Sequence, residues 1–168
     1  MLIPLGFTET PEQFSGTIQR DLNHDGRTDA WDTYQDGKQV RLGTDNNGDG
    51  RPDIWYHYEN NVLTRWEEDV NFDGNIDVWV TCDNLGRSTQ AKFDLDLDGT
   101  PETFGSYQFG RLREQQTVVP SSGQVWKKSF FTNGILREDL IDRDRDGRFD
   151  ERLFFDVHGV EVKKEAVP

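Results

Sequence analysis

Cysteine and basic residues are scarce in this sequence, and each shortage excludes a class of protein. Of the 168 residues only Cys82 is a cysteine, so the chain can form no internal disulfide. We expect Cys82 to be a small buried residue, because a catalytic thiol needs an activating neighbour that the sequence does not identify. The 19 lysines and arginines are outnumbered by 32 acidic residues. The net charge of −13 argues against nucleic acids and anionic membranes as partners and favours cations.

Long hydrophobic runs and helical periodicity are also missing. No apolar stretch approaches the roughly 20 residues of a transmembrane helix, so we expect no membrane insertion. No sustained 3.6-residue apolar spacing predicts an amphipathic helix. Residues 1–20 make a poor secretion signal, because the first basic residue is Arg20 and the apolar start is interrupted by Pro4 and Gly6. The chain either is not exported by that route or is a processed form, and we favour the second.

What the sequence does contain is a nine-residue acidic pattern, D-x-[ND]-x-D-G-x-x-[DE], in five copies. The copies begin at Asp21, Asp45, Asp69, Asp94 and Asp142, at intervals of 24, 24, 25 and 48 residues. The last interval is two periods, so a further copy is expected near Val118. There Gly123 falls on the glycine position, but every acidic residue of the loop has been replaced.

This period divides the chain into an N-terminal edge segment, 1–20, six repeats and a tail, 166–168. The repeats cover residues 21–44, 45–68, 69–93, 94–117, 118–141 and 142–165. In each, the loop precedes two strand-like stretches separated by a turn at Gly37, Asn61, Gly86, Gly110, Gly134 or Gly159. The pattern predicts an all-β fold: an elongated or coiled antiparallel meander of six β-hairpins, about twelve strands, with the acidic loops at the hairpin junctions.

The spacing of oxygen-bearing side chains predicts a calcium site in each acidic loop. Ligands at positions 1, 3 and 5 wrap around a hard cation, a glycine at 6 permits the sharp turn, and the carbonyl at 7 adds a ligand. The predicted side-chain ligands are Asp21, Asn23, Asp25, Asp29, Asp45, Asn47, Asp49, Asp53, Asp69, Asn71, Asp73, Asp77, Asp94, Asp96, Asp98, Glu102, Asp142, Asp144, Asp146 and Asp150. The predicted carbonyl ligands are Arg27, Arg51, Asn75, Thr100 and Arg148.

All-oxygen ligation favours Ca²⁺ over Zn²⁺ or copper, and Mg²⁺ fits less well because it retains several waters. Asp, Asn and Gly also form ordinary turns, but five copies in register favour a metal-binding role.

The first half of each loop resembles an EF-hand loop without its glutamate at position 12. The acid at position 9 resembles the calcium loops of integrin-type propellers and thrombospondin type 3 repeats. The W-x-x-Y-x-x-G segment resembles hairpin repeats of bacterial surface lipoproteins.

Charge connects these loops to folding. The first three contain three acidic residues each and the other two contain four each, which is 17 of the 32 in the chain. Without metal their repulsion opposes folding, so we expect five Ca²⁺ ions to contribute folding energy. Because these loops lack the ligand at position 12, we expect them to bind calcium weakly, with a Kd of roughly 10⁻⁴ to 10⁻³ M, as in extracellular modules. Such affinity predicts an extracellular or bacterial cell-surface location.

Aromatic residues recur at fixed positions of the repeat. Position 11 carries Trp31, Trp55, Trp79 and Phe104, and in the last two repeats the aromatic moves to position 13, as Phe130 and Phe154. Residues two apart share a strand face, so one sheet face keeps an aromatic ladder. The other face carries Tyr34, Tyr58, Cys82, Tyr107, Phe131 and Phe155. We expect these aromatics to pack within the sheet, or alternatively to bind a glycan or a surface protein.

These features predict an extracellular calcium-binding structural protein, in which Ca²⁺ rigidifies a surface spacer, an adhesin segment or a fibre or filament subunit. The alternative is a calcium-dependent glycan- or partner-binding module that uses the aromatic face. No nucleophile motif or phosphate loop predicts an enzyme. Edge strands near Phe14–Arg20 and Val160–Lys164 predict self-association. In the fifth repeat, Trp126 is either part of a decayed, metal-free turn or a contact for a partner.

Overall fold

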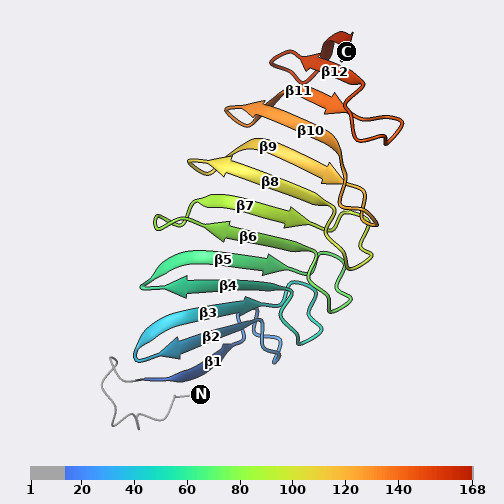
Figure 1. Cartoon of the computed structure of the whole chain (residues 1–168). Helices are drawn as coiled ribbons and strands as arrows, with labels where there is room; N and C mark the ends of the chain where they lie inside the picture. Colours follow the sequence, from blue (N-terminus) through green and yellow to red (C-terminus); the bar gives the residue numbers. More distant parts are fainter. Residues whose placement is uncertain (1–13, 168) are drawn as a thin grey trace.

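The chain folds as one open antiparallel β-sheet. The computed structural model describes residues 14–167, and within them there are 13 strands and no helix (Figure 1). Each strand pairs with its neighbours in the sequence, so the order is β1 to β13 without a crossover. The strands are β1 (Gly16–Arg20), β2 (Ala30–Gln35), β3 (Lys38–Thr44), β4 (Ile54–Glu59), β5 (Val62–Glu68), β6 (Val78–Cys82), β7 (Ser88–Phe93), β8 (Thr103–Gln108), β9 (Arg111–Val118), β10 (Val125–Thr132), β11 (Ile135–Ile141), β12 (Glu151–Phe155) and β13 (Glu161–Ala166).

The sheet has one strand more than the roughly twelve predicted. The additional strand is β1, from the N-terminal segment, which pairs with β2 from Gly16 opposite Tyr34 to Arg20 opposite Ala30. Within the described residues, β1 and β13 are the two edge strands, close to where the sequence predicts them. The meander prediction is therefore confirmed at the level of an open, all-β antiparallel sheet.

Tight turns connect the strands on one side of the sheet, the turn side (Figure 1). Four turns have two central residues that both adopt positive φ, as in the type I′ turns that match strand twist. These are Asp36–Gly37, Asn60–Asn61, Phe109–Gly110 and Asn133–Gly134. The turns at Asp83–Arg87 and Asp156–Val160 are closed by backbone hydrogen bonds and contain Gly86 and Gly159 at positive φ. All six predicted turn residues lie in turns.

The five acidic segments connect strands on the opposite side, the loop side (Figure 1). Backbone hydrogen bonds link each segment to its neighbours. The N–H of Asp53 donates to Thr44 O at 2.8 Å, and the carbonyl of Asp53 accepts a hydrogen bond from the N–H of Asp69 at 2.8 Å. Equivalent bonds recur along the loop side, so the acidic segments lie in a row.

Strand register places the position-11 aromatics in one row on a surface that we call the tryptophan face. The pairings run through Trp31, Gly43, Trp55, Glu67, Trp79, Lys92, Phe104 and Gln116. The aromatics thus occupy alternate strands, about 10 Å apart. Gly43 has a steric role in this row, because a Cβ there would lie 2.5 Å from Cζ3 of Trp55.

The opposite face contains the small core. Its buried apolar side chains are Ala30, Val80, Ala91 and Leu153. Two acidic residues, Asp32 and Asp139, are buried in the same face and are neutralised by basic neighbours. Arg20 Nε lies 2.5 Å from Asp32 Oδ2, and Lys127 Nζ lies 3.0 Å from Asp139 Oδ2. Among residues 14–167 the substantial strand contacts join consecutive strands, so the sheet is a single layer.

Candidate cation sites on the loop side

Each acidic segment is held by hydrogen bonds from its own backbone to its first aspartate. The N–H of the glycine at position 6 donates to Oδ2 of the aspartate at position 1 in all five segments, at 2.6–2.9 Å. The turn requires positive φ at that glycine, with values from 88° to 96°. Position 4 also has positive φ, as at His24 and Phe72. The loop conformation therefore depends on the aspartate and the glycine that the pattern repeats.

The carboxylates at positions 5 and 9 also accept hydrogen bonds from backbone N–H groups of the same segment. The N–H of the position-7 residue donates to Oδ1 of the position-5 aspartate at 2.8 Å in all five segments, from Arg27, Arg51, Asn75, Thr100 and Arg148. At position 9, Oδ2 of Asp29 accepts hydrogen bonds from Leu22 N at 2.6 Å and Asn23 N at 3.0 Å. Asp53, Asp77 and Asp150 accept the equivalent bond from the second residue of their segments.

Two of the five segments bring acidic groups close enough to hold one cation between them. In the fourth segment these are Asp94, Asp96 and Glu102, and in the sixth repeat they are Asp142, Asp144 and Asp146. Within each group the candidate ligand oxygens all lie within 4.8 Å of one another. The first three segments carry asparagine at position 3, which offers an amide oxygen instead of a carboxylate. The acidic groupings are thus strongest where position 3 is aspartate.

Asp142 is the most deeply buried carboxylate of the acidic segments. Its side chain is fully buried, and Oδ1 has no hydrogen-bond partner among the described residues. Burial alone would raise the pKa of this carboxyl group. Hydrogen bonds to Oδ2 from Gly147 N and Gln124 Nε2, together with the backbone N–H groups of Arg145 and Asp146, outweigh burial and hold the pKa below its usual value. A buried carboxylate oxygen without a donor, beside two further carboxylates, fits a site for a divalent cation.

The fifth repeat forms a compact turn in place of an acidic loop. The N–H groups of Ser122 and Gly123 both donate to Val119 O, and Val119 N donates to Gln124 O at 2.8 Å. Trp126 is half-buried, and the guanidinium carbon of Arg145 lies 3.9 Å from its ring centroid. Trp126 therefore has an intramolecular partner in the sixth repeat, which the sequence pattern did not reveal.

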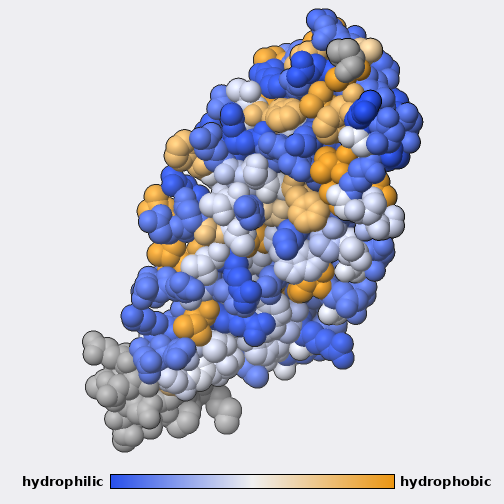
Figure 2. All heavy atoms as spheres, viewed as in Figure 1, coloured by the Kyte–Doolittle hydropathy of each residue, from blue (hydrophilic) through white to orange (hydrophobic). Residues whose placement is uncertain are grey.

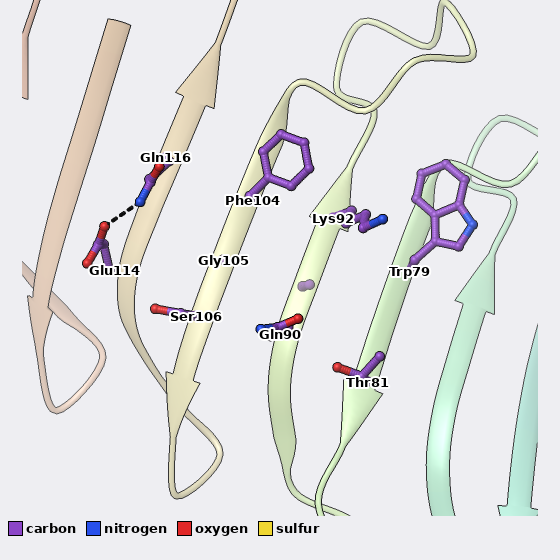
Figure 3. Close-up of a pocket in the computed structure, with 10 residues that line it drawn as sticks. Trp79, Thr81, Gln90, Lys92, Phe104, Gly105, Ser106, Glu114 and Gln116 are labelled. Atoms are coloured by element: carbon purple, nitrogen blue, oxygen red, sulfur yellow. Dashed lines mark hydrogen bonds between the residues drawn. The ribbon is translucent and has the colours of Figure 1, made fainter. Parts of the chain in front are cut away.

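The tryptophan face contains a second candidate site. A hollow of about 290 Å³ lies between Trp79 of β6 and Phe104 of β8, with Lys92 between them on β7 (Figure 3). Its remaining polar lining includes Gln90 and Glu114. Figure 3 shows these side chains on one face of four consecutive strands. Elsewhere in the row, Arg41 stacks on Trp55, with the guanidinium carbon 3.4 Å from the ring centroid.

Comparison with known proteins identifies no family for this chain. No protein-family profile matches it, and no curated protein matches it either. Solved structures give distant likenesses. A mutant of S. aureus TarM in complex with Fondaparinux, alpha-GlcNAc-glycerol and UDP matches with a TM-score of 0.36 and 10% identity, over 66% of this chain and 19% of that one.

A second structure of TarM has a TM-score of 0.37 at 10% identity, covering 88% of this chain and 21% of its own. The accessory secretory proteins 1, 2 and 3 of Streptococcus pneumoniae have a TM-score of 0.26 at 12% identity, over 76% of this chain and 19% of that chain. The chain thus spans about a fifth of the length of these proteins. In residues 14–167 there is no helix long and apolar enough to cross a membrane.

Proposed function

We propose that this chain is an extracellular or cell-surface structural protein whose acidic loops bind Ca²⁺ and thereby stiffen a single-layer sheet. The observation that carries the proposal is the buried, unpartnered Oδ1 of Asp142 beside Asp144 and Asp146. Carboxylates held this close repel one another unless a cation balances them. The group of Asp94, Asp96 and Glu102 presents the same chemistry.

Calcium suits these loops better than other metals. The donor groups are carboxylates, amides and backbone carbonyls, which are ligands of hard cations. The remaining acidic segments share the same backbone turn and the same hydrogen bond from the position-6 glycine. We therefore assign five sites, one for each acidic segment, and none to the fifth repeat.

The shape of the molecule supports a structural role. A sheet with few buried apolar side chains gains little from the hydrophobic effect. Cations bound along the loop side would fix the strand ends in a row and compensate for the missing core. The face seen in Figure 2 carries many hydrophilic side chains with apolar ones scattered among them, as suits a spacer exposed to water.

Calcium titration of the purified chain tests the proposal. Isothermal titration calorimetry and elemental analysis should give five bound Ca²⁺ per chain. Asp96→Ala removes one carboxylate from the fourth segment and should reduce the count by one or weaken that site by more than about tenfold. Glu59→Ala, which removes one exposed negative charge at the end of β4, is the matched control and should leave the count unchanged. A wild-type chain that binds no calcium at millimolar concentrations contradicts the proposal.

A second candidate function, glycan binding, is favoured by the hollow between Trp79 and Phe104. Aromatic rings stack on the apolar faces of sugars, and the amide of Gln90 can bond hydroxyls. Lys92 and Glu114 supply one charge of each sign, which favours a neutral polysaccharide. The aromatics stand on alternate strands about 10 Å apart, a spacing that suits an extended chain of sugars.

Co-sedimentation with insoluble neutral polysaccharides tests this second function. Trp79→Ala should abolish most of the binding, whereas Phe72→Ala should not, because Phe72 is an exposed aromatic in the third acidic segment. Equal binding by wild type and the Trp79 variant, or no binding by either, counts against a glycan site on this face.

A further inference from the structure

The turn that replaces the acidic loop of the fifth repeat makes four contacts with the sixth acidic segment, in addition to the pairing of β11 with β12. Gln124 Nε2 donates to Asp142 Oδ2 at 3.0 Å and to Arg145 O at 2.9 Å. The N–H of Asp142 donates to Trp126 O at 2.8 Å. The side chain of Arg145 stacks on the Trp126 ring. Both ends of the first half of the sixth acidic segment are therefore held by residues from the fifth repeat.

The link made by Gln124 occupies an equivalent place in another pair of repeats. Gln124 is at position 7 of its repeat, and Arg145 is at position 4 of the next. In the first pair, Arg27 at position 7 donates from Nη1 to the carbonyl of Gly48 at position 4, at 2.8 Å. The fifth repeat has thus lost the acidic residues of its loop but keeps a side-chain bridge to the following loop, and its bridge reaches the position-1 aspartate as well.

We infer that Gln124 is a positioning residue for the cation site of the sixth repeat; this inference rests on the calcium-binding function proposed above. Its amide holds Asp142 Oδ2, and this fixes the carboxylate so that the unpartnered Oδ1 remains free to bind a divalent cation. The same amide nitrogen donates to the carbonyl of Arg145 at 2.9 Å, so it joins two backbone-linked points of the sixth segment. Outer hydrogen bonds of this kind orient metal ligands and commonly change affinity by about 10- to 100-fold.

Terbium luminescence isolates the sixth site. Tb³⁺ replaces Ca²⁺ at oxygen sites and emits when a nearby tryptophan is excited, and Trp126 lies against Arg145 of the sixth segment. The Trp126→Phe variant keeps an aromatic ring beneath Arg145 but removes the tryptophan that excites the bound ion. The difference in Tb³⁺ emission between wild type and this variant is therefore the emission from the sixth site. Titrating that share, and competing it with Ca²⁺, measures the affinity of the sixth site within the full chain.

Gln124→Met keeps the length of the side chain and removes both hydrogen bonds. We expect it to weaken the sixth site by about 10- to 100-fold and to leave the other sites unchanged. The melting temperature in excess chelator should hardly change, because the bridge acts on the cation site. Gln35→Met, at an exposed glutamine on β2, is the matched control. If Gln124→Met disturbs the circular dichroism spectrum, Gln124→Asn, which keeps the amide but is one methylene shorter, takes its place.

The possible results separate the two proposals. If the wild-type chain binds neither Tb³⁺ nor Ca²⁺, the proposed function fails and the inference fails with it. If the wild-type chain binds cations and the Gln124 variant has the same sixth-site affinity as wild type, only the inference is overturned. An equal weakening of every site also overturns it, because that pattern indicates a general loss of structure.

Discussion

At the scale of single residues, the surroundings of each aspartate determine what its carboxylate does. Asp142 is fully buried, and its Oδ1 has no hydrogen-bond partner within residues 14–167, whereas Asp32 is buried but neutralised by Arg20. Asp83 lies in a turn and bonds to Arg87, with Nη2 and Nε at 2.7 Å and 2.9 Å from Oδ2. The same residue type thus serves as a candidate ligand, as half of an ion pair and as a turn clamp.

The Asp83–Arg87 pair predicts how the stability of the fold depends on pH. Hydrogen bonds from Arg87, first from its side chain and then from its backbone, lower the pKa of Asp83 to about 2. A lowered folded-state pKa stabilises the fold above the unfolded-state pKa, and this contribution is lost as the pH falls from about 4 towards 2. Carbon-detected NMR titration of the Asp83 carboxyl should give a midpoint near 2 in the wild type. In Arg87→Met the midpoint should rise, and an unchanged midpoint would contradict the assignment.

At the scale of elements, the hairpin turns are the most regular feature, and one of them departs from the preferred residues. The equivalent turns use Asn133–Gly134 and Asp36–Gly37, whose first residues tolerate positive φ. In the turn between β8 and β9 that place is held by Phe109, with φ of 53° and 75% of its surface exposed. A bulky side chain in this region is strained, and the hairpin itself gives no reason for a phenylalanine at this position.

Exchanging the residues of two turns tests this strain. Phe109→Asn should raise the melting temperature, by a stabilisation of roughly 1 kcal/mol, because asparagine tolerates the left-handed region. Loss of the weak contact with Arg87, whose guanidinium carbon is 5.6 Å from the ring centroid, offsets part of this gain. The reciprocal change, Asn133→Phe, should lower the melting temperature. Thermal unfolding followed by circular dichroism measures both melting temperatures. The strain argument requires that the two changes in melting temperature have opposite signs.

At the scale of the whole molecule, the chain combines a thin sheet with a large negative charge. Only four apolar side chains are buried among residues 14–167, and the net charge of the sequence is −13. Hydrophobic burial is therefore small, and charge repulsion is concentrated on the loop side. Cation binding is the contribution that can offset both.

Removing calcium should accordingly destabilise the fold. A site that binds only the folded chain stabilises it by about 2.7 kcal/mol at a ligand concentration one hundred times the Kd. Several such sites should give a large drop in melting temperature when excess chelator is added, and calcium should restore it. Added sodium chloride at equal ionic strength is the control for general screening. The same melting curve with and without chelator would argue that the loops are ordinary turns.

The edges of the sheet determine how copies of the chain could associate. Because the strands alternate in direction and number 13, β1 and β13 run parallel to each other. Head-to-tail stacking in one orientation would thus pair them in parallel, whereas two copies of β13 related by a two-fold axis pair antiparallel. Val162 on β13 is 63% exposed and would lie in such a contact. We therefore expect a dimer in place of an open filament if β13 mediates association.

Sedimentation velocity in calcium should show a concentration-dependent dimer that Val162→Lys weakens. Val157→Lys changes a similarly exposed valine in the preceding turn, outside the strand, and should leave association unaltered. A monomer at all concentrations would exclude association through this edge.

The sequence by itself determined the features that depend on neighbouring residues. Strand alternation, the turns at Gly37 or Gly134 and the acidic loops follow from local conformational preferences and from a fixed period, so they could be predicted position by position. The row of Trp31, Trp55 and Trp79 follows too, because a constant repeat length keeps equivalent residues in register.

Only the tertiary structure decided what depends on contacts between repeats. The sequence predicts an edge strand near Phe14–Arg20, but only the structure gives its register on β2, from Gly16 opposite Tyr34 to Arg20 opposite Ala30. Asp142 is buried in the folded chain, and its hydrogen bond to Gln124 joins two residues that are 18 positions apart. Trp126 faces Arg145 rather than open solvent for the same reason. These contacts arise from the twist and register of adjacent hairpins, which bring specific side chains together across the loop side. A repeat pattern gives the spacing of residues along the chain, but not which atoms meet.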